Sequence, residues 1–248
     1  MTRIRLIAVS LIAAIVLLFV APSAVADTYI VAVGINRYKN MPMLHVSEAD
    51  AKDFAALCKH YPGAHVTLIT GRYATTARLR KAIARRYAGT KADDMLIFYF
   101  SGHGAEDGCA TFDASGPGNL LSFADIARAM KRSPAKRKII IADSCHSGAS
   151  RSQSSGSRQH SSNDPDVLLF MSSRANENSQ EVRGGKNSLF THYLLRGLKG
   201  RADADSNRRI TAVELFNYVS PAVAKASGNM QHPVMWGNFD RNMVLFKY

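Results

Sequence analysis

The chain has 248 residues, of which 46% are hydrophobic and 21% charged, and these proportions exclude a wholly disordered protein. Three cysteines are too few for a disulfide-dense scaffold. The 32 Lys and Arg residues outnumber the 19 Asp and Glu residues, and the resulting formal net charge of +13 favours acidic partners or surfaces without indicating a fold.

The first 26 residues have the layout of a secretory signal peptide. Two arginines precede an apolar run at residues 6–20, and the small residues at 24–26 form an A-x-A cleavage site. We therefore expect cleavage before Asp27, export to the periplasm or the exterior, and no membrane association afterwards. The alternative is an uncleaved N-terminal membrane anchor, although an apolar run of about 15 residues is short for a span of roughly 20. Residues 27–248 are expected to form one domain.

Short apolar runs alternate with helical patterns through the rest of the chain. Strands are expected at residues 28–33, 65–69, 95–100, 139–142 and 167–171. Helices are expected at residues 48–58, 76–87, 123–130, 188–198 and 211–226. This alternation implies crossover connections and a mostly parallel sheet that is covered on both faces. Residues 149–166 are rich in Ser, Arg, Gln and Asn, and they are expected to form a mobile loop between two core strands.

Two of the predicted strands are followed by glycine- and serine-rich turns that carry a histidine and a cysteine. His103 lies in Ser-Gly-His-Gly after the strand at 95–100, and Cys145 lies in Asp-Ser-Cys-His-Ser-Gly after the strand at 139–142. Ligands bind beyond the carboxyl ends of parallel strands, so the two residues meet at one sheet edge if the strands are neighbours. A thiolate managed by an imidazole is an activated nucleophile, and flanking glycines let backbone N–H groups approach a substrate carbonyl.

These motifs resemble those of the caspase-like cysteine peptidases, and more closely those of the metacaspase and bacterial orthocaspase branch. The likeness rests on F-S-G-H-G around His103 and D-S-C-H-S-G around Cys145, and it extends to the segments at 47–51, 173–177, 189–191 and 231–233. The resemblance implies an α/β three-layer sandwich with about six strands in a mainly parallel sheet, flanked by helices. It also implies that Cys145 is the nucleophile, that His103 is the general base and acid, and that the backbone N–H groups of Gly104 and Cys145 form the oxyanion hole.

The resemblance further implies a cysteine endopeptidase that cleaves peptides or proteins after Arg or Lys. The pocket for that basic side chain would be formed by Ser47, Asp50, Ser101 and Asp143. Independently of the resemblance, two carboxylates in a cleft would pair with a cation whose burial otherwise costs several kcal/mol. The alternative interpretation makes Asp50 an acid favoured by a helix dipole and Asp143 a cap at the end of a strand.

Two further segments of the sequence concern activation by self-cleavage and the binding of a metal. Arg151 and Arg158 lie in the predicted loop after Cys145, where an Arg-directed zymogen would cut itself; incidental charges on a solvated loop are an equal alternative. No cofactor and no metal are expected. Residues 203–214 match the ligand spacing of an EF-hand calcium loop, but Arg208 stands where that loop needs glycine. A polar loop with Thr211 capping the next helix is favoured, and calcium activation is unsupported.

Two functions from other classes stay open at this point: a non-catalytic caspase-like binding module, and an exported basic protein that binds anionic polymers. The basic helix at 76–87 is interpreted as a solvated face, and nucleic acid is not an expected partner because no aromatic platform is interleaved with its charges. The protein is expected to be a monomer. Cys58 is expected in the core, and Cys109 is placed in a loop with its pairing left open.

Overall fold

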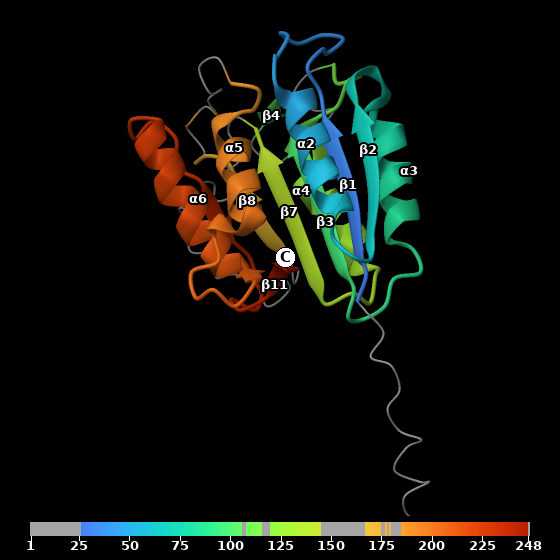
Figure 1. Cartoon of the computed structure of the whole chain (residues 1–248). Coiled ribbons are helices and arrows are strands. Elements are labelled where there is room, and N and C mark those ends of the chain that lie inside the picture. Colours follow the sequence, from blue (N-terminus) through green and yellow to red (C-terminus); the bar gives the residue numbers. More distant parts are fainter. Residues whose placement is uncertain are drawn as a thin grey trace, which may run out of the picture.

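A computed structural model describes residues 26–105, 108–115, 120–144, 167–174, 177, 179 and 185–247. Its centre is a six-stranded sheet in the order β10-β8-β7-β3-β1-β2 (Figure 1). The strands are β1 (Thr28–Gly34), β2 (Ala64–Thr70), β3 (Met95–Ser101), β7 (Arg137–Asp143), β8 (Leu168–Met171) and β10 (Val234–Trp236). All neighbours pair in parallel except β10, which runs antiparallel to β8.

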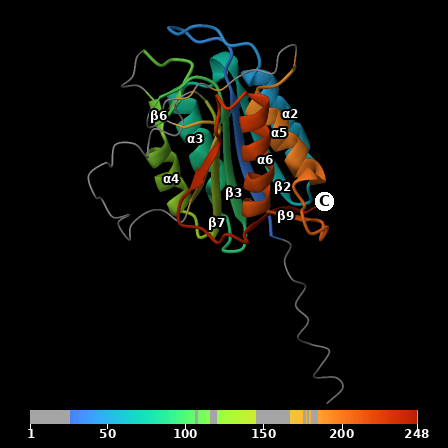
Figure 2. The ribbon, with the colours of Figure 1, turned by 90° about the vertical axis from the view of Figure 1, so that its left-hand side faces the viewer.

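Helices cover both faces of this sheet, so the molecule has three layers (Figure 2). One face carries α2 (Ser47–Lys59), α5 (Leu189–Arg196) and α6 (Ala212–Ala226), and the other carries α3 (Thr76–Tyr87) and α4 (Phe123–Lys131). Strand β3 is buried on both sides. Ile97 and Tyr99 pack in the core on the side of α2, α5 and α6, and Phe98 and Phe100 pack in the core on the side of α3 and α4. A strand buried on both sides needs such a continuous apolar run. The expected α/β three-layer architecture is confirmed.

The short elements were not expected from the sequence. A three-stranded sheet contains β4 (Gly104–Ala105), β5 (Gly108–Ala110) and β6 (Leu120–Ser122), and a two-stranded sheet contains β9 (Arg209–Thr211) and β11 (Val244–Lys247). A 3-10 turn at Gly71–Tyr73 and a π-helical turn at Gly197–Arg201, which follows α5, complete the elements of the described residues. The helix expected at 188–198 therefore ends as an α-helix at Arg196.

The expectation that Cys109 lies in a loop is wrong. Cys109 belongs to β5 and is fully buried, because β5 is the middle strand of the small sheet. Cys58 lies in the core as expected. Both cysteines are free thiols, and burial raises the pKa of each.

Several helix termini follow side-chain signals. Thr211 caps α6 as expected and forms a capping box with Glu214, in which each side chain accepts the other residue's backbone N–H. Ser188 caps α5 by accepting the N–H of Thr191 at 3.2 Å. The second cap matters for the site, because it fixes Ser188 at the sheet edge.

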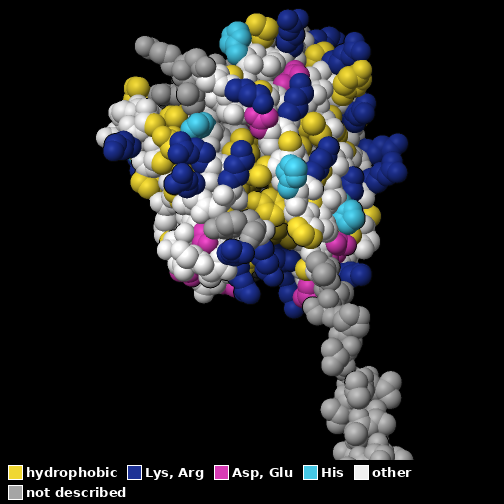
Figure 3. Space-filling model, in the orientation of Figure 1, with side chains coloured by type: hydrophobic (Ala, Val, Ile, Leu, Met, Phe, Trp, Pro, Cys, Tyr) yellow, Lys and Arg dark blue, Asp and Glu magenta, His cyan; other side chains and the backbone are white. Residues whose placement is uncertain are grey.

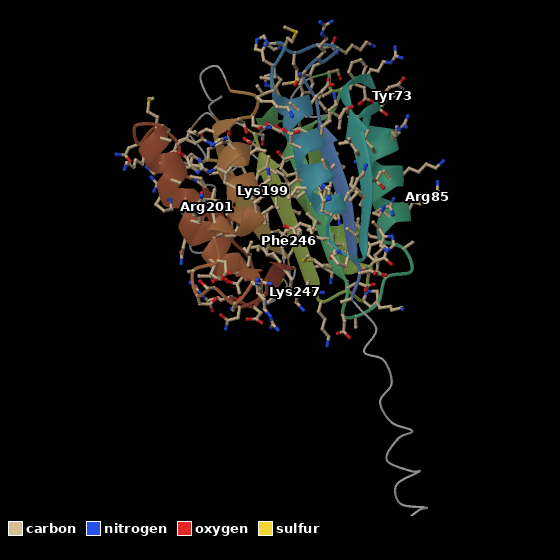
Figure 4. All side chains as sticks on the ribbon, viewed as in Figure 1. Tyr73, Arg85, Lys199, Arg201, Phe246 and Lys247 are labelled. Atoms are coloured by element: carbon tan, nitrogen blue, oxygen red, sulfur yellow. The ribbon has the colours of Figure 1, made fainter. Side chains whose placement is uncertain are left out.

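The surface carries many lysines and arginines, which are spread over the face drawn in Figure 3. On α3, Arg78, Arg80, Lys81 and Arg85 are exposed, and Arg85 extends from the helix into solvent (Figure 4). This placement agrees with the interpretation of α3 as a solvated basic face. Within the described ranges, no helix combines the length and apolar character needed to cross a membrane.

Some predictions fall outside the described residues. These are the signal segment up to residue 25, the loop at 149–166, and the residues Cys145, Arg151 and Arg158.

Candidate active site

The two strands that carry the motifs share one edge of the sheet. Strands β3 and β7 are parallel neighbours, and Ser101 at the end of β3 pairs with Asp143 at the end of β7. The two strands are therefore neighbours, which is the condition for His103 and Cys145 to lie at one edge of the sheet. His103 follows β3 by two residues, and Cys145 follows β7 by two residues in the chain.

A glycine at the end of β1 brings α2 to the same edge. Gly34 pairs with Ser101 of β3. A Cβ atom at Gly34 would overlap the carbonyl oxygen of Ser47 and lie 2.7 Å from the Cβ of Ala51. The absent side chain therefore lets the first turn of α2, which contains Ser47 and Asp50, pack directly against the end of the strand.

Asp50 and Asp143 form a buried carboxylate pair bridged by one serine. Their exposed fractions are 0% and 3%. The N–H of Ser188 donates to Asp50 Oδ1 at 3.0 Å, and the Ser188 hydroxyl donates to Asp143 Oδ2. The Ser101 hydroxyl donates to Asp50 Oδ2 at 2.9 Å. Three of the four residues predicted for the pocket are thus in one hydrogen-bond network, and Ser47 lies in the same helical turn as Asp50.

The hydroxyl groups of Thr191 and Tyr99 form a second set of hydrogen bonds that ends at Asp143. The Thr191 hydroxyl donates to Asp143 Oδ2 at 2.7 Å and lies 2.6 Å from the hydroxyl of Tyr99. The Thr191 N–H also donates to Asp143 Oδ2, at 3.2 Å. These donors compensate the burial of the carboxylate, which explains how an acid can occupy the interior edge of the sheet.

The electrostatics of the pair favour the binding of a cation. Burial and the neighbouring Asp143 raise the pKa of Asp50 to about 7, while hydrogen bonds from Ser101, Asn187 and Ser188 act in the opposite direction. Burial likewise raises the pKa of Asp143. Two full negative charges are therefore costly here at neutral pH, and a guanidinium or ammonium group would stabilise the ionised forms.

A small pocket is lined by Asp143 of the pair and reaches His103. Its lining includes Val46, Ser47, Ser101, His103, Asp143 and Ser188. Asp50 does not line the pocket itself; it acts through Ser101 and Ser188, to which it is bonded. Ser144, the last described residue of this segment, also lines the pocket, and its hydroxyl is buried without a partner among the described residues.

Two contacts orient His103. Its Nε2 lies 2.8 Å from the carbonyl oxygen of Pro42. A carbonyl oxygen only accepts, so Nε2 carries the proton and Nδ1 is left with a lone pair in the neutral ring. The backbone N–H of His103 donates to the Tyr38 hydroxyl at 2.7 Å, and the two rings lie 4.9 Å apart. These two contacts fix the imidazole so that Nδ1 is the nitrogen free of the Pro42 carbonyl.

Glycines on both sides of His103 have distinct structural reasons. A Cβ atom at Gly102 would overlap the Tyr38 hydroxyl, so a side chain there would displace the tyrosine that holds His103. Gly104 pairs with Cys109, while the N–H of Ala110 donates to the His103 carbonyl at 2.9 Å. The Gly104–Cys109 pair is therefore the non-hydrogen-bonded kind, in which the Gly104 N–H points away from β5.

Sequence reasoning missed four residues of this site. Pro42 contributes only its carbonyl oxygen, for which a sequence holds no signal. Tyr38 lies in an irregular segment before α2, with no motif to mark it. Ser188 had one usable signal, a serine at the start of a predicted helix, which is typical of a cap but gives no indication of a contact with Asp143, and Thr191 had none.

The described residues contain one group of side chains that could hold a metal ion, formed by Asp203, Asp205 and Glu214. Its oxygens already accept backbone N–H groups: Asp203 from Asn207 and Arg208, and Glu214 from Ala204. The group lies beside β9, whose partner β11 is at the lower end of the sheet in Figure 1, away from the upper ends of β3 and β7.

Comparisons with known proteins agree with this architecture. A family model described as a caspase domain matches residues 28–244. The crystal structure of a protein from Geobacter sulfurreducens is similar over 86% of this chain and 94% of that chain, with a TM-score of 0.62 and 20% sequence identity. The similarity to the Geobacter sulfurreducens structure shows that the two proteins share a fold. A comparison with curated proteins gave no match.

Proposed function

Because this chain belongs to the caspase-domain family, which supports a cysteine-peptidase-like function, we propose that it is an endopeptidase that cleaves after Arg or Lys. The observation that carries the proposal is the register of β3 and β7. It pairs Ser101 with Asp143, so that His103 and Cys145 each follow a paired position by two residues. Of the branches of the family, we propose the metacaspase and orthocaspase branch, because the acids of that branch's basic pocket match Asp50 and Asp143.

The proposed reaction uses a Cys145–His103 dyad. His103 Nδ1 takes the proton from the thiol, and Cys145 Sγ attacks the carbonyl carbon of the scissile bond. His103 then donates this proton to the leaving amine as the C–N bond breaks, which leaves an acyl-thioester on Cys145. Water hydrolyses the thioester and restores the thiol. The bond from His103 Nε2 to the Pro42 carbonyl supports this role, because it leaves Nδ1 as the basic nitrogen.

The oxyanion that develops on the substrate carbonyl would be held by the N–H groups of Gly104 and Cys145. The support comes from the pairing of β4, in which the Gly104 N–H points away from the neighbouring strand. Loss of one such donor in an oxyanion hole typically lowers kcat by about 100-fold or more.

Specificity for a basic residue would come from the carboxylate pair. Asp143 and the serines of the pocket face the substrate, and Asp50 supplies charge from behind Ser101. An acidic substrate residue would need a cation in this pocket, but the position six residues before Asp50 is Leu44, and this leucine lies on the lining. Ser47 completes the polar wall.

The remaining parts of the proposal follow from the sequence. The protein is proposed to be exported after loss of residues 1–26, to act as a monomer on peptides or proteins, and to need no cofactor. Arg151 and Arg158, which a basic-specific enzyme would recognise, are proposed as sites of self-cleavage in a zymogen.

Fluorogenic peptides with Arg, Lys, Asp or Ala before the scissile bond test the proposal on the protein that begins at Asp27. We expect turnover of the Arg and Lys peptides only, and loss of turnover in Cys145→Ala. Cys58→Ala serves as the matched control, because Cys58 is buried in the core away from the pocket and should leave turnover unchanged. Equal turnover in Cys145→Ala would rule out the nucleophile, and a preference for Asp peptides would rule out the pocket. Arg151→Gln with Arg158→Gln should abolish any self-cleavage seen in the parent protein.

A further inference from the structure

A buried carboxylate lies at the opposite end of the sheet, where the described chain begins. Asp94 comes immediately before β3 and is 3% exposed. Its Oδ2 accepts the N–H of Lys91 at 2.6 Å, and its Oδ1 accepts the N–H of Asp27 at 3.0 Å. The side chain of Asp94 is therefore fixed by two backbone donors, one of which belongs to the residue before β1.

The position of the Asp27 nitrogen is set by the sheet. The Asp27 carbonyl oxygen accepts the N–H of Met95 at 2.9 Å, and the next residue, Thr28, donates its N–H to the Gly63 carbonyl at 2.9 Å. Asp27 is thus held to the start of β3, and its neighbour is held to the turn before β2. None of these bonds involves Ala26, so they do not depend on the chain that precedes Asp27.

Asp27 is also the residue that the predicted signal cleavage would make the first of the chain. Hydrolysis of the Ala26–Asp27 bond adds one water: Ala26 receives the hydroxyl and leaves as a carboxylate, and the Asp27 nitrogen becomes an amine that takes up a proton at neutral pH. This nitrogen is the atom that lies 3.0 Å from Asp94 Oδ1.

We propose that Asp94 binds the processed N-terminus, and that cleavage before Asp27 turns an amide–carboxylate hydrogen bond into a partly buried ion pair. The proposal rests on the predicted cleavage site and is independent of the peptidase function. Strand β1 runs from this pair to Gly34 at the catalytic edge, between β2 and β3 (Figure 1). Processing would therefore fasten the start of a central strand whose other end positions the pocket.

Other titratable and charged groups lie near the Asp94–Asp27 pair and contribute to its electrostatic environment. The neighbouring titratable and charged groups are Arg137, Asp93, Tyr29, Arg86, His65 and the side chain of Asp27 itself. The charge of Asp94 acts to raise the pKa of Arg137 and the pKa of Tyr29. The carboxylate of Asp27 lies 3.4 Å from His65 Nε2. Asp94 is the acid among them that bonds directly to the Asp27 nitrogen, so its removal should have the largest effect on an amine at that position.

The ion pair should stabilise the protein less at high pH than at neutral pH. An unperturbed α-amine has a pKa of about 7.7–8.0, and a partly buried carboxylate in direct contact raises it. The ion pair would then contribute its full stability below the unfolded-state pKa, and this contribution would be lost as the pH rises through the higher folded-state pKa.

The experiment compares two proteins, one beginning at Asp27 and one at Ala26, each released from a fusion partner by a protease that leaves the stated first residue. The α-amine pKa is measured by NMR titration. We expect a value above about 9 for the protein that begins at Asp27, and about 8 for the one that begins at Ala26, whose amine is one residue away from Asp94.

Asp94→Asn tests the binding of the N-terminus, and Asp93→Asn is its matched control because it removes an adjacent exposed charge. Asp94→Asn should return the amine of the Asp27 protein to about 8, and Asp93→Asn should leave it above about 9. Equal pKa values in the two unsubstituted proteins would overturn the proposal, and this comparison holds even if Asp94→Asn fails to fold. N-terminal sequencing of the exported protein should give Asp27; another first residue would contradict the processing step.

Discussion

His103 Nε2 lies 2.8 Å from the carbonyl oxygen of Pro42, so a backbone group occupies the place that a carboxylate takes in many catalytic triads. A carbonyl oxygen fixes the tautomer as an Asp side chain does, but it adds no full negative charge to stabilise an imidazolium. A thiol needs less help than a hydroxyl to lose its proton, which makes a neutral orienting group sufficient for a cysteine nucleophile.

Tyr38 should support this geometry from the other side of the ring. Tyr38→Phe removes the hydroxyl that accepts the His103 N–H, leaves that donor without its partner, and should lower kcat by about tenfold with little change in KM. Tyr73→Phe is the matched control, because the Tyr73 hydroxyl is exposed and bonds to Arg72. A KM effect in place of a kcat effect would show that Tyr38 acts on substrate binding and not on His103.

The carboxylate pair predicts how substrate affinity depends on pH. The pKa of Asp50 is raised to about 7, and a substrate cation binds the ionised form. KM for an Arg peptide should therefore fall as the pH rises through about 7, while KM for an otherwise identical Ala peptide should change little. Steady-state kinetics between about pH 5.5 and 8.5 measure both. Parallel pH profiles for the two peptides would contradict a role for this pair in recognising charge.

The same pair should lower the stability of the free enzyme. Its folded-state pKa values lie above the value of about 3.9 for an unfolded Asp, so the folded state binds more protons and stability falls as the pH rises from about 4 to 7. Asp143→Asn removes one charge and should raise Tm at pH 8 by about 3 °C or more, while it lowers kcat/KM for Arg peptides by at least about tenfold. A lower Tm at pH 8 would show that the hydrogen bonds to Asp143 outweigh the repulsion.

Substitution of Ser188 can distinguish its structural role as the cap of α5 from a role in substrate binding. Ser188→Ala removes both the cap of α5 and the hydroxyl that bonds to Asp143, and Ser122→Ala removes the equivalent cap of α4 at a residue that does not line the pocket. Each should cost about 1 kcal/mol of unfolding free energy, measured by urea denaturation. Only Ser188→Ala should also raise KM for an Arg peptide. Equal KM values in the two variants would remove Ser188 from the binding site.

The three acids beside β9 belong to the strand pair β9–β11, and β11 lies at the lower end of the sheet in Figure 1, away from the upper ends of β3 and β7, so peptidase activity should not depend on a divalent metal bound to these acids. Turnover of an Arg peptide should be the same with a chelator and with added calcium. Asp205→Asn should leave turnover unchanged under both conditions. Activity that appears only with calcium, and disappears in Asp205→Asn, would show that the loop controls the distant site.

The sequence predicted the features that arise from local pattern and strand order. Strand β3 was predicted because residues 95–100 form a continuous apolar run, which the structure buries completely. The meeting of the two strand ends was predicted on the condition that β3 and β7 are neighbours, which they are. Strand β10 was missed because Val234–Trp236 is short, only half-buried and preceded by a proline. The bridge from Ser188 to Asp50 and Asp143 joins residues separated by 138 and 45 positions, and no local pattern encodes such a distance.

Covalent labelling tests the central claim most directly. A peptide chloromethyl ketone with arginine next to the reactive group should alkylate the protein once, and peptide mass spectrometry should locate the adduct on Cys145. Cys58 and Cys109 should stay unmodified because both are buried and have raised pKa values. His103→Ala should slow the labelling by about 100-fold or more. An adduct on another residue, or undiminished labelling of Cys145 in His103→Ala, would contradict a dyad formed by these two side chains.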